Sequence, residues 1–261
     1  MTGIIIAAVV VSLTGLILGL FLGVMGKKFA VEVDQKEIDV RAELPGNNCG
    51  GCGYAGCDAL AKAIAAGQAD VGACPVGGAP VAEKIGEIMG VAGGAAEKKV
   101  AFVKCAGTCD KTKVQYNYYG VDDCKKVSVV PGAGEKACAY GCMGYGSCVK
   151  ACAFDAIHVV DGVAVVDKEK CVACGMCVAS CPNHLIELVP YKAEHLVQCS
   201  SHDKGKDVKA VCAAGCIGCT LCTKQCEFDA IHMENNLAVI DYEKCTNCGK
   251  CAEKCPVKVI V

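Results

Sequence analysis

The chain has 261 residues, 25 of them cysteine, and a formal net charge of −2. A nearly neutral chain without a basic cluster among aromatic residues is not expected to bind nucleic acid. With 5 Phe, 8 Tyr and no Trp it lacks the aromatic mass of one large core, so we expect several small modules, each stabilised by bound metal.

The N-terminal stretch predicts a membrane anchor. Residues 4–25 carry no charge and are followed by Lys27 and Lys28. As a helix this stretch reaches about 33 Å, enough to cross the apolar core of a bilayer. A cleaved signal peptide is the alternative, but the apolar run is too long and no basic residue precedes it. The two lysines predict a single-pass protein of the cell (inner) membrane with the bulk of the chain on the cytoplasmic side.

The orientation bears on the cysteines, because a reducing cytoplasm does not sustain disulfides and the thiols are then predicted to be metal ligands. The first group follows the anchor with the spacing C-x2-C-x4-C-x16-C, over Cys49, Cys52, Cys57 and Cys74. Its glycines allow the backbone to bend tightly around a metal, and residues 58–66 are predicted to form a helix. We expect a [4Fe–4S] cluster here; a structural zinc site is the alternative.

The second half of the chain contains a tandem repeat. Residues 141–182 and 215–256 align without gaps at an offset of 74 residues. In each copy two alternating stretches flank a turn, Asp161-Gly162 in the first and Asn235-Asn236 in the second, which predicts a β-hairpin. Short helices are expected after the cysteine runs, so each copy contains two half-units of cysteine loop, helix and strand.

The second copy carries two C-x2-C-x2-C-x3-C runs, the pattern of two-cluster ferredoxins, in which the fourth cysteine of each run binds the other cluster. The predicted ligand sets are Cys216, Cys219, Cys222 and Cys255, and Cys226, Cys245, Cys248 and Cys251. A pair of zinc sites is the alternative, although zinc typically uses cysteine pairs with a longer spacer.

The first copy departs from this pattern at one position. Its regular set is Cys152, Cys171, Cys174 and Cys177, but Tyr145 stands where the second copy has Cys219. Cys138 fills this vacancy if the loop folds back, which predicts the set Cys138, Cys142, Cys148 and Cys181. The alternative is a site with three ligands, similar to [3Fe–4S].

Five cysteines are left over: Cys105, Cys109, Cys124, Cys199 and Cys212. Two interpretations stay open: four of them bind a sixth cluster, or all are buried thiols that behave as small hydrophobes. Five [4Fe–4S] clusters are therefore expected, with room for a sixth.

The predicted fold class is α+β, with an N-terminal transmembrane helix, a small [4Fe–4S] domain and tandem two-cluster bacterial ferredoxin-like modules. The expected segments are an anchor (1–26), a linker (27–45), the [4Fe–4S] domain (46–95), a cysteine-containing connecting region (96–135), module 1 (136–187), a second linker (188–210) and module 2 (211–261).

The span, the segment LPGNNCGGCGYAGC and the tandem repeat together resemble the B subunits of the Rnf complex, the ion-pumping ferredoxin:NAD+ oxidoreductase of bacteria. The resemblance implies a component of a translocase that accepts electrons from reduced soluble ferredoxin and passes them to membrane partner subunits, with Na+ or H+ movement coupled to that flow. The family's cluster ligands fall on Cys49, Cys52, Cys57 and Cys74 and on the ferredoxin-type cysteines.

No catalytic residue or substrate site of its own is expected in the chain. We predict that electrons enter at the C-terminal modules and leave through the Cys49–Cys74 site beside the membrane. Two alternatives remain: an electron-transfer subunit of another membrane oxidoreductase, such as a hydrogenase or a quinone-linked enzyme, and a metal-binding interaction protein without redox function.

Overall fold

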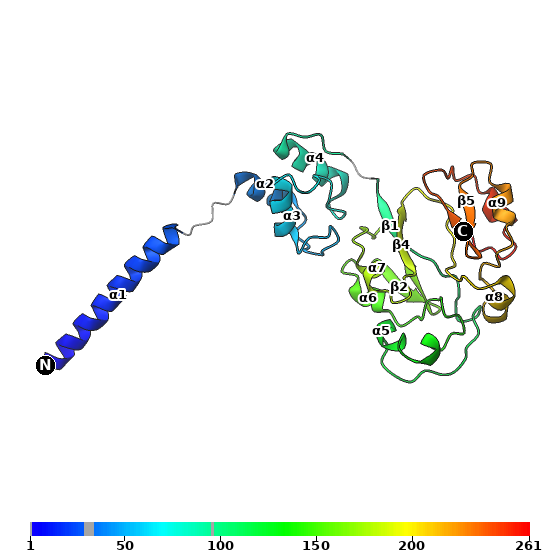
Figure 1. Ribbon diagram of the computed structural model, residues 1–261, viewed down its shortest axis with the longest axis horizontal. Coiled ribbons are helices and arrows are strands. Elements are labelled where there is room, and N and C mark those ends of the chain that lie inside the picture. Colours follow the sequence, from blue (N-terminus) through cyan, green and yellow to red (C-terminus); the bar gives the residue numbers. More distant parts are fainter. Residues whose placement is uncertain (1, 29–33, 95–96) are drawn as a thin grey trace.

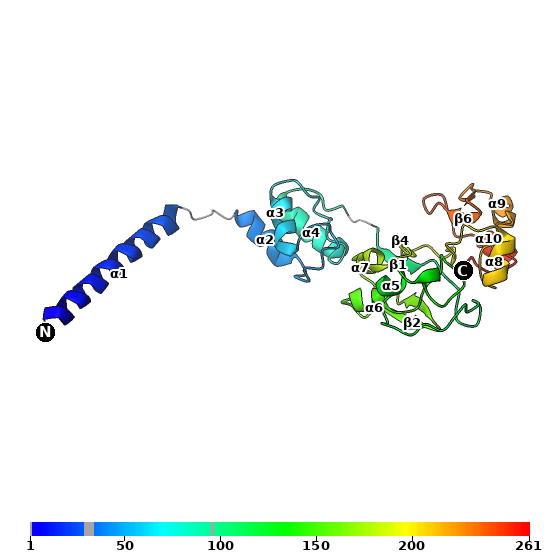
Figure 2. The ribbon, with the colours of Figure 1, turned by 60° about the horizontal axis from the view of Figure 1, so that its bottom comes forward.

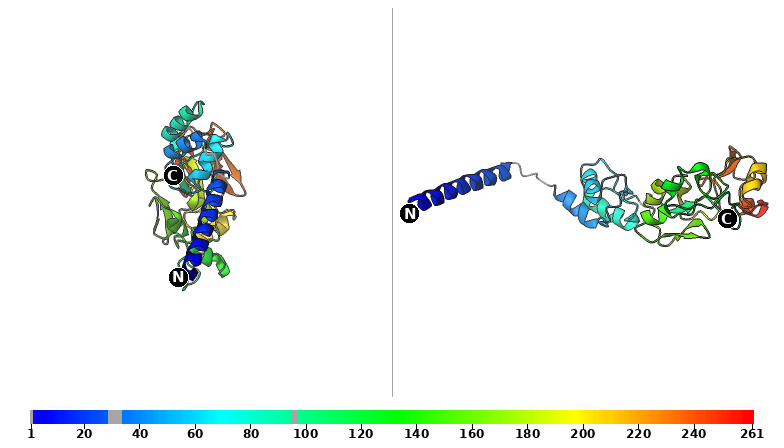
Figure 3. Two further views of the ribbon diagram at one scale, coloured as in Figure 1. Left: turned by 90° about the vertical axis from the view of Figure 1, so that its left-hand side faces the viewer. Right: turned by 90° about the horizontal axis from the view of Figure 1, so that it is seen from below.

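The computed structural model describes residues 2–28, 34–94 and 97–261, which form a mixed helix and strand protein. Its parts follow one another in a row (Figures 1 to 3). The long N-terminal helix lies at one end, a small helical domain comes next, and two bodies that each contain a hairpin complete the chain. The repeat copies occupy these last two bodies.

Helix α1 (Thr2–Lys28) is the apolar N-terminal segment. Its large side chains, such as Leu13, Leu16 and Phe21, are more than half exposed. Residues 2–26 are long and apolar enough to span a membrane, with a mean hydropathy of 2.8 over their most apolar window, and this is the one such helix in the described part of the chain. An apolar helix that the other described residues leave unburied suits a membrane.

The helical domain contains α2 (Gln35–Glu43), α3 (Cys57–Ala65) and α4 (Gly78–Met89). Asp34 caps α2, because its side chain accepts a hydrogen bond of 3.0 Å from the backbone N–H of Lys36. Val40, Leu60, Ile64 and Ile85 are almost fully buried between the three helices. The helix that the sequence predicts over residues 58–66 is α3.

The first repeat copy contains α6 (Ser147–Ala151), the hairpin strands β2 (Ile157–Val160) and β3 (Val163–Val166), and α7 (Met176–Ser180). Strand β4 (Ile186–Pro190) follows and pairs antiparallel with β1 (Lys99–Val103), which lies upstream in the stretch expected to be a connecting region. The loop between β1 and α6 carries α5 (Cys124–Val127) and a short 3-10 helix, Pro131–Ala133. Val100, Ile157, Leu185 and Val189 are buried in one core, so β1 belongs to the body of the first copy.

The second repeat copy repeats these elements with α9 (Leu221–Gln225), β5 (Ile231–Glu234), β6 (Leu237–Ile240) and α10 (Lys250–Lys254). Its hairpin has the register of the first, as the 74-residue offset predicts. Helix α8 (Gly205–Val211) precedes it. A single bridge between Val197 and Ile260 takes the place of the Val103–Ile186 pair of β1 and β4. In both copies, a segment that precedes the copy therefore pairs with the same edge residue, Ile186 in the first and Ile260 in the second.

Candidate functional site

Each ferredoxin-type cysteine run ends in a helix of five residues. The third cysteine of each run is the second residue of α6, α7, α9 or α10, and the fourth is the cap at the end of that helix. The residue before each helix has a positive φ, as at Gly249 (75°) and Thr220 (61°). The backbone thus turns sharply after the second position of each run, which is Tyr145 in the earlier run of the first copy and cysteine in the other runs. The helix separates the last two thiols of the run.

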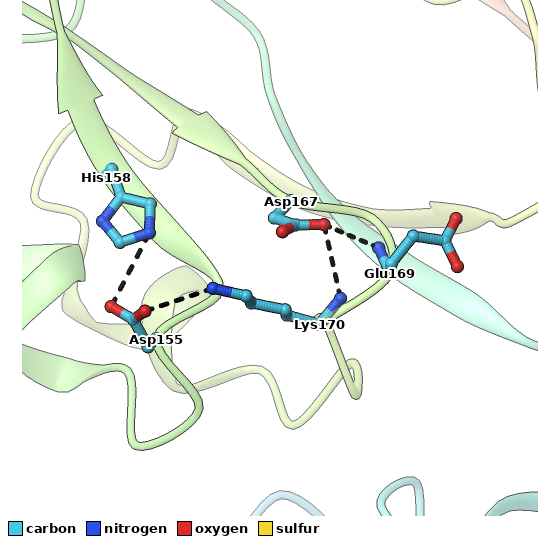
Figure 4. Close-up of polar contacts among 5 residues, drawn as sticks. All are labelled: Asp155, His158, Asp167, Glu169 and Lys170. Carbon is cyan, nitrogen blue, oxygen red and sulfur yellow. Dashed lines mark hydrogen bonds and ion pairs between the residues drawn. The ribbon is translucent and has the colours of Figure 1, made fainter.

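The turn that leads into each later run is closed by an aspartate. The Asp167 carboxylate accepts hydrogen bonds of 2.9 and 3.4 Å from the backbone N–H groups of Glu169 and Lys170 (Figure 4). Asp241 does the same for Glu243 at 3.0 Å in the second copy. Such Asx turns fix the backbone just before Cys171 and Cys245, the first thiols of the two runs.

His158, which the repeat duplicates as His232, has a structural role in this region. Its Nε2 lies 3.6 Å from an oxygen of Asp155, whose other oxygen lies 3.3 Å from the Nζ of Lys170 (Figure 4). Both the histidine and the aspartate are about half exposed or more, so these pairs add little to stability. They lie on the exposed side of the hairpin.

The loop of residues 49–57 is closed by Asn48. Its side-chain oxygen accepts a hydrogen bond of 2.8 Å from the backbone N–H of Cys57, the first residue of α3. Gly56 has a φ of 148°, and a Cβ there would lie 3.0 Å from that same oxygen, so glycine is required. Cys57 and Cys74 are buried in the core of this domain, with Cys52 packed against them. The thiols of Cys52 and Cys57 also lie near enough to Cys74 to raise its pKa, after burial, which is the main cause.

The cysteines of the repeat gather around separate small cavities. One is lined by Cys152, Cys171, Cys174 and Cys177, and another by Cys226, Cys245, Cys248 and Cys251, as the spacing predicts. In the second copy Cys216, Cys222 and Cys255 share one core, and the thiols of Cys216 and Cys219 lie near that of Cys222.

The irregular set of the first copy differs from the expectation. Its cavity is lined by Cys124, Cys142, Cys148 and Cys181. Burial raises the pKa of Cys148 to about 12, with further contributions from the nearby thiols of Cys142, Cys124 and Cys181. Cys124, which begins α5 in the loop upstream, thus stands where the sequence analysis placed Cys138.

Tyr145, the residue at the position of Cys219, is not among the residues that line this cavity. Its ring packs edge-on against Tyr118, with the ring centroids 5.3 Å apart. Its hydroxyl is buried and finds no hydrogen-bond partner within the described part of the chain. The loop between β1 and α6, which we call the insertion loop, supplies both the ring partner Tyr118 and the thiol of Cys124.

Cys138 lies elsewhere, beside Cys105 and Cys212. Burial is the main cause of its raised pKa, and the two neighbouring thiols raise it further. The structure therefore does not bring Cys138 to the set of Cys142, Cys148 and Cys181. Among the other unassigned cysteines, Cys109 is exposed, whereas Cys199 and Cys212 are buried.

The chemistry of these sets fits iron–sulfur clusters. All 25 cysteines lie in the described ranges, and every one is a free thiol. Backbone N–H groups donate to the sulfurs of two predicted ligands at equivalent places in both copies, from Leu185 to Cys181 and from Val259 to Cys255, both at 3.4 Å. Hydrogen bonds of this kind stabilise thiolate sulfur in cluster proteins. Within the described residues no three Cys, His, Asp or Glu side chains converge as the ligands of a single metal ion would.

The helical domain touches the first repeat copy through its cysteine loop. Gly51, between Cys49 and Cys52, packs so closely on the backbone of Cys174 that a Cβ would overlap its carbonyl group. The thiol of Cys49 is also near enough to that of Cys174 to raise its pKa, although burial is the larger cause. Two cysteine sets from distant parts of the sequence are therefore neighbours.

Three family models match the chain. Residues 44–76 match the family described as "Putative Fe-S cluster", residues 164–187 match the "4Fe-4S binding domain", and residues 215–259 match the "4Fe-4S dicluster domain". These segments contain the cysteine loop of the helical domain, the later run of the first copy and both runs of the second.

The chain is also similar to curated proteins along nearly its whole length. It is 48% identical to the B subunit of the Na(+)-translocating ferredoxin:NAD(+) oxidoreductase complex of Acetobacterium woodii, over 94% of this chain and 74% of that protein. It is 44% identical to the B subunit of the ion-translocating oxidoreductase complex of Methanosarcina acetivorans, over 94% and 93%. It is 40% identical to the proton-translocating counterpart of Clostridium ljungdahlii, over 100% and 93%.

Proposed function

The chain belongs to the family of B subunits of Rnf-type ion-translocating oxidoreductase complexes, and we propose that it relays electrons from reduced ferredoxin to its partner subunits. It is an electron-transfer subunit with 4Fe-4S domains, part of a ferredoxin:NAD+ oxidoreductase. Membership of this family sets aside the hydrogenase and quinone-linked alternatives. When bound, a [4Fe–4S] cluster accepts and donates one electron at a time.

The protein's own contribution is to hold thiolates close together at fixed positions. The proposed ligand sets are Cys49, Cys52, Cys57 and Cys74; Cys152, Cys171, Cys174 and Cys177; Cys124, Cys142, Cys148 and Cys181; Cys216, Cys219, Cys222 and Cys255; and Cys226, Cys245, Cys248 and Cys251. Cys124 replaces Cys138 in the third set because it lines the same cavity as the other three thiols. The two repeat copies thereby act as the tandem ferredoxin-like modules that the sequence predicts.

The contact between Gly51 and Cys174 is the observation that carries the proposal. It joins the set nearest α1 to the regular set of the first copy, and Figure 1 shows the second copy beyond them on the side away from α1. Cysteine sets that follow one another in a row give an electron a path along the molecule. Electrons then enter at the second copy and leave through the Cys49–Cys74 set.

The membrane and the partners complete the proposal. Helix α1 is the proposed anchor, and the positive charges of Lys27 and Lys28 after it support a cytoplasmic location for the cysteine-rich bulk. Soluble ferredoxin is the electron donor and the other subunits of the complex are the acceptors. The names of the relatives include both Na+ and proton translocation, and that coupling belongs to the complex as a whole.

The test is chemical and spectroscopic. Full-length protein purified without oxygen is expected to contain iron and acid-labile sulfide in equal amounts, with EPR signals that develop on mixing with reduced ferredoxin. Zinc without sulfide would contradict the proposal and support an interaction protein. Replacement of Cys57 by serine is expected to abolish ferredoxin-driven NAD+ reduction by the complex, whereas full activity in that variant would show that electrons leave by another route.

A further inference from the structure

We propose that Cys105, Cys138, Cys199 and Cys212 hold a sixth [4Fe–4S] cluster, placed between the two repeat copies as the link between them. This inference rests on the proposed electron-transfer function and extends it to a site that none of the matched family segments contains. Four observations carry it: the symmetry of the four thiols, their shared cavity, the hydrogen bonds to their sulfurs and a buried lysine.

The four cysteines form two equivalent pairs. Cys138 and Cys212 are separated by the repeat offset of 74 residues. Val103 pairs with Ile186 at the edge of the first copy, and Val197 pairs with Ile260 at the edge of the second. Cys105 and Cys199 lie two residues after these two valines. Each copy and the chain that leads into it therefore contribute the same two thiols.

These four thiols line one cavity. Cys105 and Cys212 lie near enough to Cys138 to raise its pKa further after burial, which is the main cause. Cys138 in turn lies near enough to Cys199 to add to the rise in pKa that burial causes there. A Cβ on Gly107 would lie 3.5 Å from the sulfur of Cys105 and 3.6 Å from that of Cys212. All four cysteines are thus among the residues that line this cavity, as the binding of a cubane by four thiolates requires.

The sulfurs of Cys105 and Cys199 have the hydrogen bonds of cluster ligands. Cys105 Sγ accepts from the backbone N–H groups of Gly107 and Cys142, both at 3.4 Å. Cys199 Sγ accepts from those of Ser201 at 3.4 Å and Cys216 at 3.3 Å. Cys142 and Cys216 are repeat equivalents and begin the first cysteine run of each copy, so the site contacts a neighbouring set on both sides.

Lys136 places a buried positive charge beside the four thiols. Its side chain lines the same cavity, and the residue is only 7% exposed. Its ammonium group donates hydrogen bonds of 2.9 and 2.6 Å to the carbonyl oxygens of Gly107 and Gly162, and it pairs with no carboxylate in the described ranges. A lysine is rarely buried without a negative partner. An iron–sulfur cubane with four thiolates carries net negative charge and supplies that partner.

The position of this site gives it a specific role in the relay. It lies between the set of Cys216 in the second copy and the set of Cys142 in the first, with a direct hydrogen bond to each. One electron passes at each step from a reduced set, which is oxidised, to its neighbour, which is reduced, and no proton or atom is transferred. Reduced ferredoxin supplies the electrons and the partner subunits remove them.

The first test counts iron and sulfide in the full chain purified without oxygen. Six occupied sets correspond to about 24 iron atoms per chain and five to about 20. The double variant Cys138→Ser/Cys212→Ser is expected to lose about four of each element. The control Cys109→Ser removes an exposed thiol that lies four residues after Cys105, and it is expected to lose neither iron nor sulfide. A starting value of about 20 with no loss in the double variant overturns the sixth site. A chain without sulfide overturns the proposed function as well, so the two failures are distinguishable.

The second test follows the transfer itself by rapid freezing and EPR after mixing with reduced ferredoxin. In the double variant the sets of the second copy are expected to be reduced at an unchanged rate, while those of the first copy are reduced many-fold more slowly. Reduction of the first copy at the original rate would show that the site is not the link.

A third measurement does not depend on removing a ligand. Lys136→Gln eliminates the buried positive charge, which favours the more negative, reduced state of a nearby cluster. One midpoint potential in an EPR-monitored redox titration is expected to fall while the others stay constant. The exposed Lys113→Gln is the control and should shift none. Unchanged potentials in the Lys136 variant would contradict a cluster at this site.

Discussion

The backbone N–H of Cys124 donates a hydrogen bond of 2.8 Å to the hydroxyl of Ser147, the first residue of α6. That hydroxyl in turn donates to the carboxylate of Asp123 at 3.1 Å. Asp123 also caps α5 through the N–H of Lys125, which is the main reason that the pKa of its carboxyl lies below the usual value. This short network ties the insertion loop to the first repeat copy and positions Cys124 at the cavity.

Ser147→Ala is therefore expected to loosen Cys124, the fourth ligand of the proposed set that also contains Cys142, Cys148 and Cys181. Ser147 is buried, and its loss leaves the N–H of Cys124 without an acceptor, at a cost of about 1–3 kcal/mol. We expect partial conversion of one [4Fe–4S] cluster to a three-iron form, detected by EPR of the oxidised protein. Ser128→Ala, at the other end of α5, is the control and should leave the spectrum unchanged.

Cys124→Ser is expected to remove one iron ligand and to convert the same set to the three-iron form. A second substitution, Tyr145→Cys, places a thiol at the position that Cys219 occupies in the second copy. The double variant should recover the four-iron spectrum and the iron content of the original protein. Recovery would identify the site that has lost its ligand, whereas an unchanged iron content in Cys124→Ser alone would mean that Cys124 is not a ligand.

Tyr145→Phe separates packing from ligation. The tyrosine hydroxyl is buried without a hydrogen-bond partner among the described residues, and the ring contact with Tyr118 survives the change. We expect the free energy of unfolding to stay the same or to rise by about 1 kcal/mol, with no change in iron content. A clear loss of stability or of one iron per chain would show that the hydroxyl contributes to the site.

Gly51→Ala is expected to weaken the contact between the helical domain and the first copy, because its Cβ would overlap the backbone of Cys174. Iron content should not change, since Gly51 is not a ligand. Electron transfer from the first copy to the Cys49–Cys74 set should become slower, which freeze-quench EPR can resolve. Gly94→Ala is the matched control, as a Cβ there would contact nothing within 4 Å. Equal rates in both variants would mean that this contact does not carry the transfer.

Deletion of residues 2–28 tests the anchor. Helix α1 exposes its apolar side chains along its length, so we expect the truncated chain to leave the membrane fraction and to keep its iron and sulfide. Sedimentation of membranes followed by iron analysis of both fractions measures this. A truncated chain that remained with membranes lacking the other subunits would argue against α1 as the anchor.

Local patterns predicted much of this structure. Alternation around Asp161-Gly162 identified the hairpin of β2 and β3, and the 74-residue offset transferred it to β5 and β6. The three-residue spacing within the cysteine runs likewise identified thiols that share a cavity. In these segments the contacts depend on residues that are close in the sequence.

Contacts between distant segments were not predictable in this way. The sequence predicts Cys138 as the missing ligand if the loop before Cys142 folds back, whereas Cys124, farther upstream in the same loop, lines that cavity. The equivalence of Cys105 and Cys199 was hidden because the insertion before Cys138 breaks the constant offset. The structure reveals this equivalence, because Val103 pairs with Ile186 and Val197 pairs with Ile260.

The five-residue helices have a consequence for damage by oxygen. In the second copy α9 carries Cys222 near its start and is capped by Cys226, and these two thiols belong to different proposed ligand sets. One five-residue helix would thus support two clusters at once. Oxidative loss of one cluster would release this helix and expose the other cluster to the same attack. Both clusters of such a module should therefore be lost together.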